Sequence, residues 1–303
     1  MAGLDLTVVW AFIIAFAVAA YVVMDGFDLG IGILFPRVPV GPERDRAMNT
    51  VAPIWDGNET WLVLGGGGLL AAFPLAYAII LPAFYAPLIA MLLGLVLRGV
   101  AFETRWRDPA HRHLWDAAFA VGSTVAALAQ GIVLGGLLQG VKIEGRVYAG
   151  GGWWDWLSPF SLLTGVSLVC GYALLGSGWL ILKSDGRLQQ RAYRFARPLA
   201  FGLLAAIIGV STATPFLDGN CYRRWFAWPG VLAAVQMPLL VQRLPCCADS
   251  PPRPVREYST GPSSSPIDTA KGVLDSGAKR NGVKRSGFAH LFRARQARPG
   301  SVS

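Results

Sequence analysis

Long apolar runs separated by short polar stretches fill the chain as far as Val241. A helix that spans a bilayer needs roughly 20 mostly apolar residues, whereas the strands of a membrane barrel alternate apolar and polar positions. The runs in this chain are continuously apolar, so the pattern predicts an all-α, polytopic transmembrane helix bundle. We expect about seven spanning helices, at Leu6–Phe35, Trp61–Leu81, Pro82–Phe102, Leu114–Leu138, Leu157–Leu182, Pro198–Phe216 and Trp225–Val241.

The composition agrees with a membrane protein. Hydrophobic residues make up 53% of the 303 residues, charged residues only 15%, and the mean hydropathy is +0.45. This is more apolar surface than one soluble core of ordinary composition buries. We expect a four-helix membrane bundle in residues 1–140, an incomplete second bundle of three helices in residues 141–242, and a polar tail in residues 243–303.

The positions of the basic residues predict how the helices are oriented. Arginine and lysine residues are concentrated in the connections after the first, third and fifth expected spans, and no basic residue lies between the second and third spans. In membrane proteins the cytoplasmic connections carry the excess of basic residues. We therefore expect the odd-numbered connections in the cytoplasm and the N-terminus outside.

The tail from Arg243 onward is rich in proline and serine and strongly basic. It holds eleven lysine or arginine residues against four acidic ones and has no apolar run near spanning length, so we expect it to be disordered. Two interpretations fit these residues. The tail could be a basic arm attracted to anionic lipid on the cytoplasmic face. It could also be the product of a truncated or frameshifted coding region, which is the interpretation we favour.

Acidic residues interrupt or adjoin two of the apolar runs. Asp25 and Asp28 are three residues apart in the first span and share one helix face, and Asp56 and Glu59 repeat this spacing at the start of the second. A carboxylate in hydrocarbon is costly unless it is paired, hydrated or protonated, which makes such residues candidates for function. Both pairs lie toward the expected cytoplasmic side. We therefore expect the four carboxylates to converge and to form a proton path.

Two further charges belong to the third expected span. Arg98 lies inside its apolar run and Glu103 just past the end of that run. An arginine in hydrocarbon needs a carboxylate partner, so we expect Arg98 to pair with an acid of the first or second span. Each of these charges could instead lie at a helix end and extend to the lipid headgroups, Glu103 most readily.

The three histidines, His111, His113 and His290, all lie outside the expected spans. No spanning helix therefore offers an imidazole to a haem or a copper ion, and we predict no metal site and no catalytic residue in this chain. Two classes of function remain compatible with the acids. A proton- or ion-coupled transporter also holds acids near the membrane midplane, although it usually shows repeated broken helices. A purely structural membrane subunit is the other class.

Three motifs resemble subunit II, the smaller core subunit, of cytochrome bd-type quinol oxidases: Met24–Gly32 (MDGFDLGIG), Ala52–Trp61 (APIWDGNETW) and Leu97–Glu103 (LRGVAFE). The sequences of these motifs are most similar to the cyanide-insensitive branch, and the resemblance covers about residues 1 to 242. It implies a multi-pass protein of the bacterial plasma (inner) membrane. It also implies an oxidoreductase complex that oxidises quinol and reduces oxygen to water.

The resemblance further implies the partners and cofactors of the chain. In this family a larger subunit I binds two b-type haems and one d-type haem, and the smaller subunit packs against it as a pseudo-symmetric partner. The expected partners are therefore subunit I and membrane lipid, with quinol and oxygen as substrates of the complex and no nucleic acid. Some members also hold a quinone in the smaller subunit, so a quinone is a possible cofactor.

The resemblance assigns roles to single residues of this chain. Asp25 and Asp56 match positions assigned to proton uptake, and we add Glu59 to this proton path. Asp28 and Arg98 match polar positions that stabilise the haem-bearing assembly. We group Glu103 with that pair as a candidate for a structural ion pair and consider Trp55 a possible quinone contact. The resulting candidate residues are Trp55 together with Asp25, Asp28, Asp56, Glu59, Arg98 and Glu103.

Overall fold

The computed structural model describes residues 5–150 and 152–217. Within them the chain forms α-helices joined by short turns, two 3-10 helices (η1 and η2) and one antiparallel hairpin. The expected span Trp225–Val241 and the expected tail lie outside the described residues. The elements are α1 (Leu6–Leu34), η1 (Phe35–Arg37), α2 (Pro42–Asn49), α3 (Trp55–Ala72), α4 (Pro74–Ala83), α5 (Tyr85–Arg107), α6 (Arg112–Gln139), β1 (Ile143–Glu144), β2 (Val147–Tyr148), α7 (Pro159–Lys183), α8 (Gly186–Ala213) and η2 (Thr214–Phe216).

Five helices in the described part are long and apolar enough to cross a membrane: α1 continued by η1, then α5, α6, α7, and α8 continued by η2. The predicted α-helical class is confirmed at this level, and the direction in which the helices cross stays a prediction. Local sequence explains where helices begin. At α7 the Ser158 hydroxyl accepts a hydrogen bond from the Ser161 backbone at 2.9 Å, and Pro159 occupies the first turn, where its missing amide hydrogen costs nothing.

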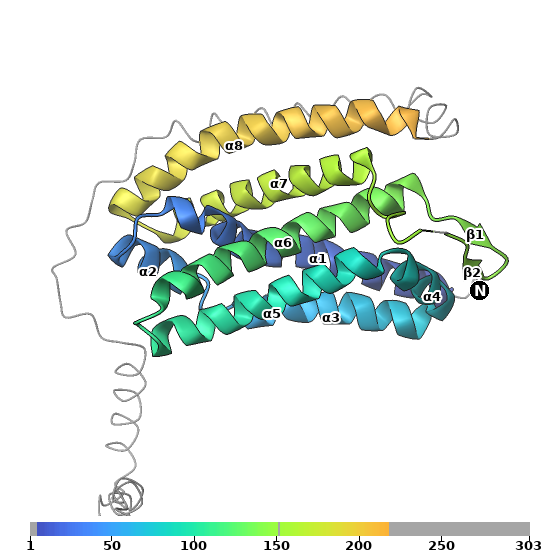
Figure 1. Cartoon of the computed structure of the whole chain (residues 1–303), viewed down its shortest axis with the longest axis horizontal. Helices are drawn as coiled ribbons and strands as arrows, with labels where there is room; N and C mark the ends of the chain where they lie inside the picture. Colours follow the sequence, from blue (N-terminus) through green and yellow to red (C-terminus); the bar gives the residue numbers. More distant parts are fainter. Residues whose placement is uncertain (1–4, 151, 218–303) are drawn as a thin grey trace, which may run out of the picture. The chain divides into compact units, whose positions relative to one another are not determined.

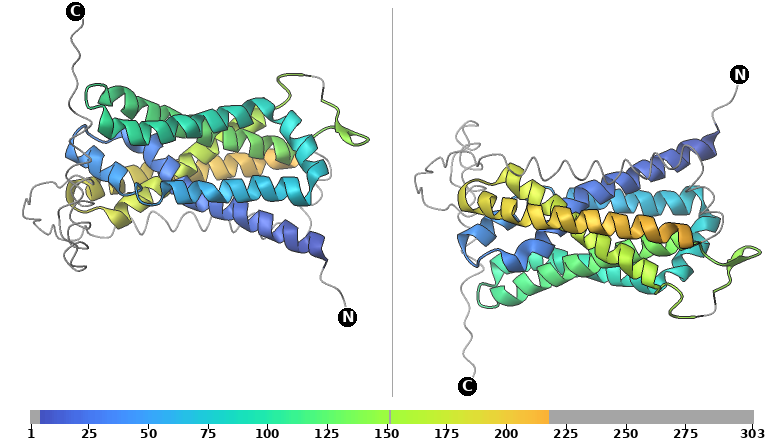
Figure 2. Two further views of the ribbon diagram at one scale, coloured as in Figure 1. Left: turned by 90° about the horizontal axis from the view of Figure 1, so that it is seen from below. Right: turned by 90° about the horizontal axis from the view of Figure 1, so that it is seen from above.

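The long helices pack side by side, with α6 in contact with α1, α5 and α7 (Figure 1). Helix α7 also packs against α1 and α8, and α3 packs against α1. Both views of Figure 2 show the N-terminal half of α1 diverging from its neighbours, in agreement with the exposed side chains of Phe12 and Phe16. Helix α2 lies at the end where α5 meets α6, and the β1–β2 hairpin lies at the opposite end near α4 (Figure 1).

Glycines form the closest helix crossings. A Cβ atom at Gly30 of α1 would overlap the backbone carbonyl of Tyr172 in α7, and one at Gly176 would overlap the backbone of Gly30. Gly94 of α5 and Gly122 of α6 meet similarly, since a Cβ on either would come within 2.7 Å of the other's carbonyl oxygen. Small residues let helix backbones touch in membrane proteins, where packing rather than water drives association. These crossings place the buried face of α1 directly against α7.

The second expected span is not one helix. The pattern predicts a continuous helix over Trp61–Leu81, but α3 ends at Ala72 and α4 begins with Pro74. Proline disfavours helical geometry in the residue before it, so the chain bends at Phe73. Helix α3 also begins at Trp55, earlier than expected, because the polar residues before the apolar run form its first turns.

The boundaries of two other spans are also corrected. The third, expected at Pro82–Phe102, begins at Tyr85 and runs to Arg107, because Pro82 still belongs to α4 and the charged residues after Phe102 continue the helix. The sixth, expected at Pro198–Phe216, begins at Gly186. The basic segment that we expected in a connection is helical, since arginine favours helices and its long side chain reaches the headgroups from within one.

Candidate functional site

A buried arginine joins three helices. Arg98 of α5 is 1% exposed, and its Nη1 donates to Asp25 Oδ1 of α1 at 2.8 Å. Its Nη2 donates to Glu59 Oε1 of α3, also at 2.8 Å. Charge-assisted hydrogen bonds of this length are among the strongest in proteins, because both groups are ionised. One guanidinium therefore fixes α1, α3 and α5 relative to one another.

A second polar contact joins α1 to α3 beside it. Asp28 is buried, and its Oδ2 accepts a hydrogen bond from Asn58 Nδ2 at 2.7 Å. The same amide nitrogen donates to the backbone carbonyl of Met24 at 3.1 Å. Asn58 received no role from the sequence because a single amide at the start of an apolar run gives no distinct signal. We name the group Asp25, Asp28, Asn58, Glu59 and Arg98 the acid cluster.

The acid cluster contains more carboxyl groups than cations. Three carboxyl groups, from Asp25, Asp28 and Glu59, face the one guanidinium of Arg98. In the part of the chain that the structure describes, Asp25 Oδ2 and Asp28 Oδ1 are buried and have no hydrogen-bond partner. Excess negative charge is costly in a medium of low dielectric constant, and a bound proton reduces it. The cluster is therefore chemically suited to taking up and giving off a proton.

Exposure changes stepwise along the three acids assigned to proton uptake. Asp56 is exposed in the first turn of α3, the Glu59 side chain is 28% exposed, and the Asp25 side chain is 1% exposed. Asp56 lies near enough to Glu59 to act on it electrostatically. The structure thus forms a graded series from the surface to Arg98, and it places Asp56 outside the buried cluster.

Two other candidates lie apart from the ion pairs of the cluster. Glu103 is exposed on α5, and its side chain makes no hydrogen bond or ion pair among residues 5–150 and 152–217. The Trp55 ring is partly buried and stacks on Phe102 with centroids 5.4 Å apart, while Gly99 lies against its edge. A quinone contact through Trp55 stays a prediction.

A second ionic network, which was not predicted from the sequence, lies where α2 meets α5 and α6. Arg105 is buried, donates through Nη2 to Asp45 at 2.8 Å and binds Asp116 through Nε. Arg44 donates to the other Asp116 oxygen at 2.9 Å, and Arg112 donates to Asp45 at 2.6 Å. In the sequence the arginines of this network indicate only the orientation of the helices. Their aspartate partners come from other segments of the chain. The network anchors α2 to the helix ends.

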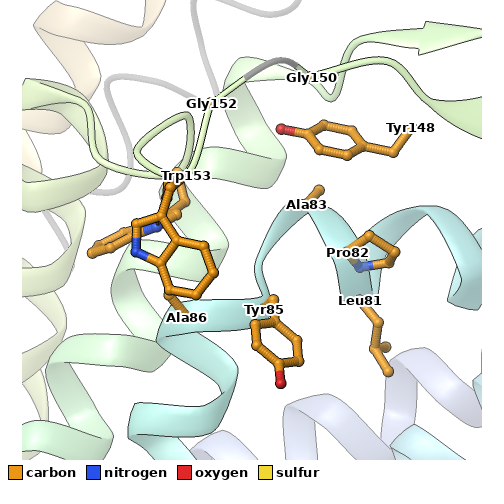
Figure 3. Close-up of a pocket in the computed structure, with 10 residues that line it drawn as sticks. Leu81, Pro82, Ala83, Tyr85, Ala86, Tyr148, Gly150, Gly152 and Trp153 are labelled. Atoms are coloured by element: carbon orange, nitrogen blue, oxygen red, sulfur yellow. Dashed lines mark hydrogen bonds between the residues drawn. The ribbon is translucent and has the colours of Figure 1, made fainter.

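An aromatic pocket lies at the opposite end, where α4 meets α5. It has a volume of about 510 Å³, and Figure 3 shows Tyr148 of β2 and Trp153 from the segment after the hairpin facing Pro82 and Tyr85. Tyr85 precedes Arg98 by 13 positions in α5, which is about 20 Å along a helix. The pocket contains no acid, so it is separate from the acid cluster.

The histidines of the described part do not fit haem ligation. His111 and His113 are exposed beside the start of α6, and the His111 ring contacts Asp108 at 2.9 Å. Within residues 5–150 and 152–217, no group of three or more histidine, cysteine, aspartate or glutamate side chains is arranged to hold a metal ion. Haem iron needs an axial ligand such as a buried imidazole. The described helices do not present one.

Comparisons with known proteins identify the family of the chain. Residues 6–248 match the family model described as cytochrome bd terminal oxidase subunit II. A "Cytochrome bd-I ubiquinol oxidase subunit 2" of Escherichia coli (strain K12) is 35% identical over 216 residues, which are 67% of this chain and 56% of that relative. A "Probable cytochrome oxidase subunit 2" of Haemophilus influenzae is 36% identical over 191 residues, 61% of this chain and 50% of the relative.

A more distant relative extends the comparison beyond these two bacteria. The "Cytochrome bd ubiquinol oxidase subunit 2" of Bacillus subtilis (strain 168) is 29% identical over 218 residues, which are 71% of this chain and 64% of the relative. The chain therefore spans about half of the length of the first relatives and somewhat more of this one. The family model covers most of the chain, including every described helix. The chain belongs to the cytochrome bd terminal oxidase subunit II family.

Proposed function

We propose that this chain is the non-haem-ligating subunit of a membrane-bound quinol:oxygen oxidoreductase. Family membership supports this function, as do relatives whose names describe subunit 2 of a ubiquinol oxidase. A second subunit, subunit I, is then the partner that holds the b- and d-type haems, since the described helices offer no buried imidazole. The haems supply electron transfer and oxygen reduction, and this chain provides a path for protons and structural support.

The graded exposure from Asp56 through Glu59 to Asp25 is the observation that carries the proposed proton path. A proton binds first at the exposed carboxylate, passes to the partly exposed one, and reaches the buried one. Arg98 holds the last two acids on one guanidinium, so water molecules need to bridge only short gaps between them. The basic connections favour a cytoplasmic position for this end of the bundle.

Asp28 and Arg98 have a structural role in this proposal. They join α1 to α3 and α5 through buried polar contacts, and so fix the helices that carry the proton path. A buried charge that loses its partner is strongly destabilising, so loss of either residue is expected to reduce assembly with subunit I before it changes the chemistry. Glu103, which is exposed on α5, is not needed for this role.

Two measurements test the oxidase function. The first is purification of the chain from the membrane of its own cell, with an absorption spectrum of whatever co-purifies. Co-purification with a haem-containing membrane polypeptide is expected, and a preparation free of haem would contradict the oxidase assignment. The second is oxygen consumption with added quinol, which is expected in that preparation.

The proton path is tested by removing one carboxyl group at a time. Asp25→Asn, Glu59→Gln and Asp56→Asn are expected to keep the haem spectrum and to slow quinol-dependent oxygen consumption, because each interrupts the series. Glu103→Gln is the matched control, since this exposed acid has no partner in the described part of the chain. Unchanged turnover in all three assembled variants would favour the purely structural subunit instead.

A further inference from the structure

A chain of hydrogen bonds crosses three helices next to the acid cluster. The Tyr172 hydroxyl of α7 donates to Gln130 Oε1 of α6 at 2.8 Å, and Gln130 Nε2 donates to the Tyr21 hydroxyl of α1 at 2.7 Å. Tyr21 and Tyr172 are 4% and 1% exposed, and Gln130 is partly buried. Buried polar groups are normally satisfied in this way, but such a chain also has a direction.

The direction of the chain points toward Asp25. An amide oxygen only accepts and an amide nitrogen only donates. Gln130 therefore accepts from Tyr172 and donates to Tyr21, and the two hydrogen bonds run in the same direction. The Tyr21 oxygen accepts from the amide, which leaves its own hydrogen to be donated elsewhere. Asp25 follows Tyr21 by four residues on the same face of α1, and the two side chains interact. The unpartnered Asp25 Oδ2 is therefore the acceptor within reach.

We infer that Tyr21 is a positioning residue for Asp25, oriented by Gln130 and Tyr172. This inference rests on the proposed proton path, because it concerns the innermost acid of that path. Arg98 binds one oxygen of Asp25, which leaves the other, unpartnered oxygen for the Tyr21 hydroxyl. Together they hold the carboxylate in one orientation, and hydrogen-bond donors bind an ionised carboxylate more strongly than a protonated one.

Other groups also act on Asp25, from its own helix and from each helix packed against it. The charged or titratable groups facing it are Arg98 of α5, Glu59 of α3, Asp28 and Tyr21 of α1, and Tyr172 of α7. From α6 the polar group is the neutral amide of Gln130. Of these, Tyr21 is the one whose hydrogen bond can be removed without changing any charge, so it gives the clearest test.

The test compares pH profiles of quinol-dependent oxygen consumption in the assembled complex. Tyr21→Phe removes the hydroxyl but keeps the ring, and the limb of the profile that depends on Asp25 is expected to move by about one pH unit to higher pH. Gln130→Met is expected to give a smaller shift in the same direction, and Tyr172→Phe a still smaller one. Tyr85→Phe is the matched control, because that side chain is exposed about 20 Å away along α5.

A second readout does not depend on turnover. Infrared difference spectra between acidic and neutral pH report the carbonyl stretch of a protonated carboxyl group, and the band absent in Asp25→Asn belongs to Asp25. Its frequency or its titration midpoint is expected to change in Tyr21→Phe, while the haem spectrum reports that the complex is assembled. A lower yield of complex with an unmoved profile and band would assign Tyr21 a purely structural role and overturn the inference.

Failure of this inference can be told apart from failure of the proposed function. If Asp25→Asn leaves turnover unchanged, the proton path itself is wrong. If Asp25→Asn slows turnover but Tyr21→Phe and Gln130→Met keep the wild-type pH profile, only the positioning role is wrong. A graded shift across the three variants, with none in Tyr85→Phe, supports the inference.

Discussion

Arg98 and Asp25 lie 73 residues apart in the sequence, yet the guanidinium donates to the carboxylate at 2.8 Å and each side chain is only 1% exposed. Either charge alone would be costly in a membrane interior, whereas the pair compensates both. The contact joins α1 to α5, and the loss of one partner leaves a buried charge behind. This asymmetry makes the pair directly testable.

Arg98→Met is expected to destabilise the protein by about 3–5 kcal/mol, because it leaves Asp25 without its cation. Thermal unfolding in detergent, followed by size-exclusion chromatography, measures the loss. The double variant with Asp25→Asn is expected to recover part of the stability, since it removes one of the carboxylates that lost their cation. An unchanged melting temperature in Arg98→Met would contradict the pairing.

Asn58→Leu is expected to cost about 1–3 kcal/mol, because the Asp28 carboxylate loses its donor while remaining buried. The same unfolding assay measures the effect. Thr60→Val serves as the control, because the exposed Thr60 hydroxyl bonds only to the backbone of its own helix. Equal losses in the two variants would show that the contact between α1 and α3 does not depend on Asn58.

Gly30→Ala is expected to destabilise the crossing of α1 and α7 by about 1–3 kcal/mol or more, because the added methyl group meets backbone that cannot yield. Gly66→Ala is the matched control in α3, since beyond its own turn of helix no atom lies within 4 Å of the position its Cβ would take. Alanine favours a helix over glycine by about 1 kcal/mol, so this control is expected to be neutral or stabilising. Similar melting temperatures for the two variants would contradict the close crossing.

Arg105→Met is expected to release α2 from the ends of α5 and α6, because Asp45 and Asp116 lose their shared cation. Amide hydrogen exchange should then become faster across Pro42–Asn49 than in the rest of the bundle. Arg107→Met, an exposed neighbour on the same helix, is the control. Exchange in α2 that stays at the wild-type rate would show that the network is dispensable for anchoring this helix.

The α-helical class and an acidic partner for Arg98 could be predicted from the sequence, because each follows from the cost of polar groups in a membrane. Continuous apolar runs of spanning length allow few alternatives, and a guanidinium among apolar residues requires an acid nearby. The sequence could not tell which acid pairs with Arg98, because that depends on how the helices are rotated about their axes. The i, i+3 spacing placed Asp56 with Glu59, yet an early start of α3 leaves Asp56 exposed.

Other features could not be predicted for different physical reasons. Neutral polar residues such as Asn58, Tyr21 and Gln130 carry no charge that demands a partner, so their contacts emerge only from tertiary packing. The ion pairs of Asp116 join segments 11 and 72 residues apart, and spacing along the chain gives no information on them. The helix break at Phe73 had a local signal in Pro74, which the apolar run on both sides concealed.

The crossing of Gly30 with Gly176 has a mechanical consequence for residues it never touches. Each residue advances a helix by about 100° around its axis, and Tyr21, Asp25 and Asp28 all belong to the helix whose azimuth this crossing sets. A small roll of α1 would carry all three side chains away from Gln130, Arg98 and Asn58 together. The contact of these two glycines therefore also supports the hydrogen bonds that the polar side chains of α1 make with α3, α5 and α6.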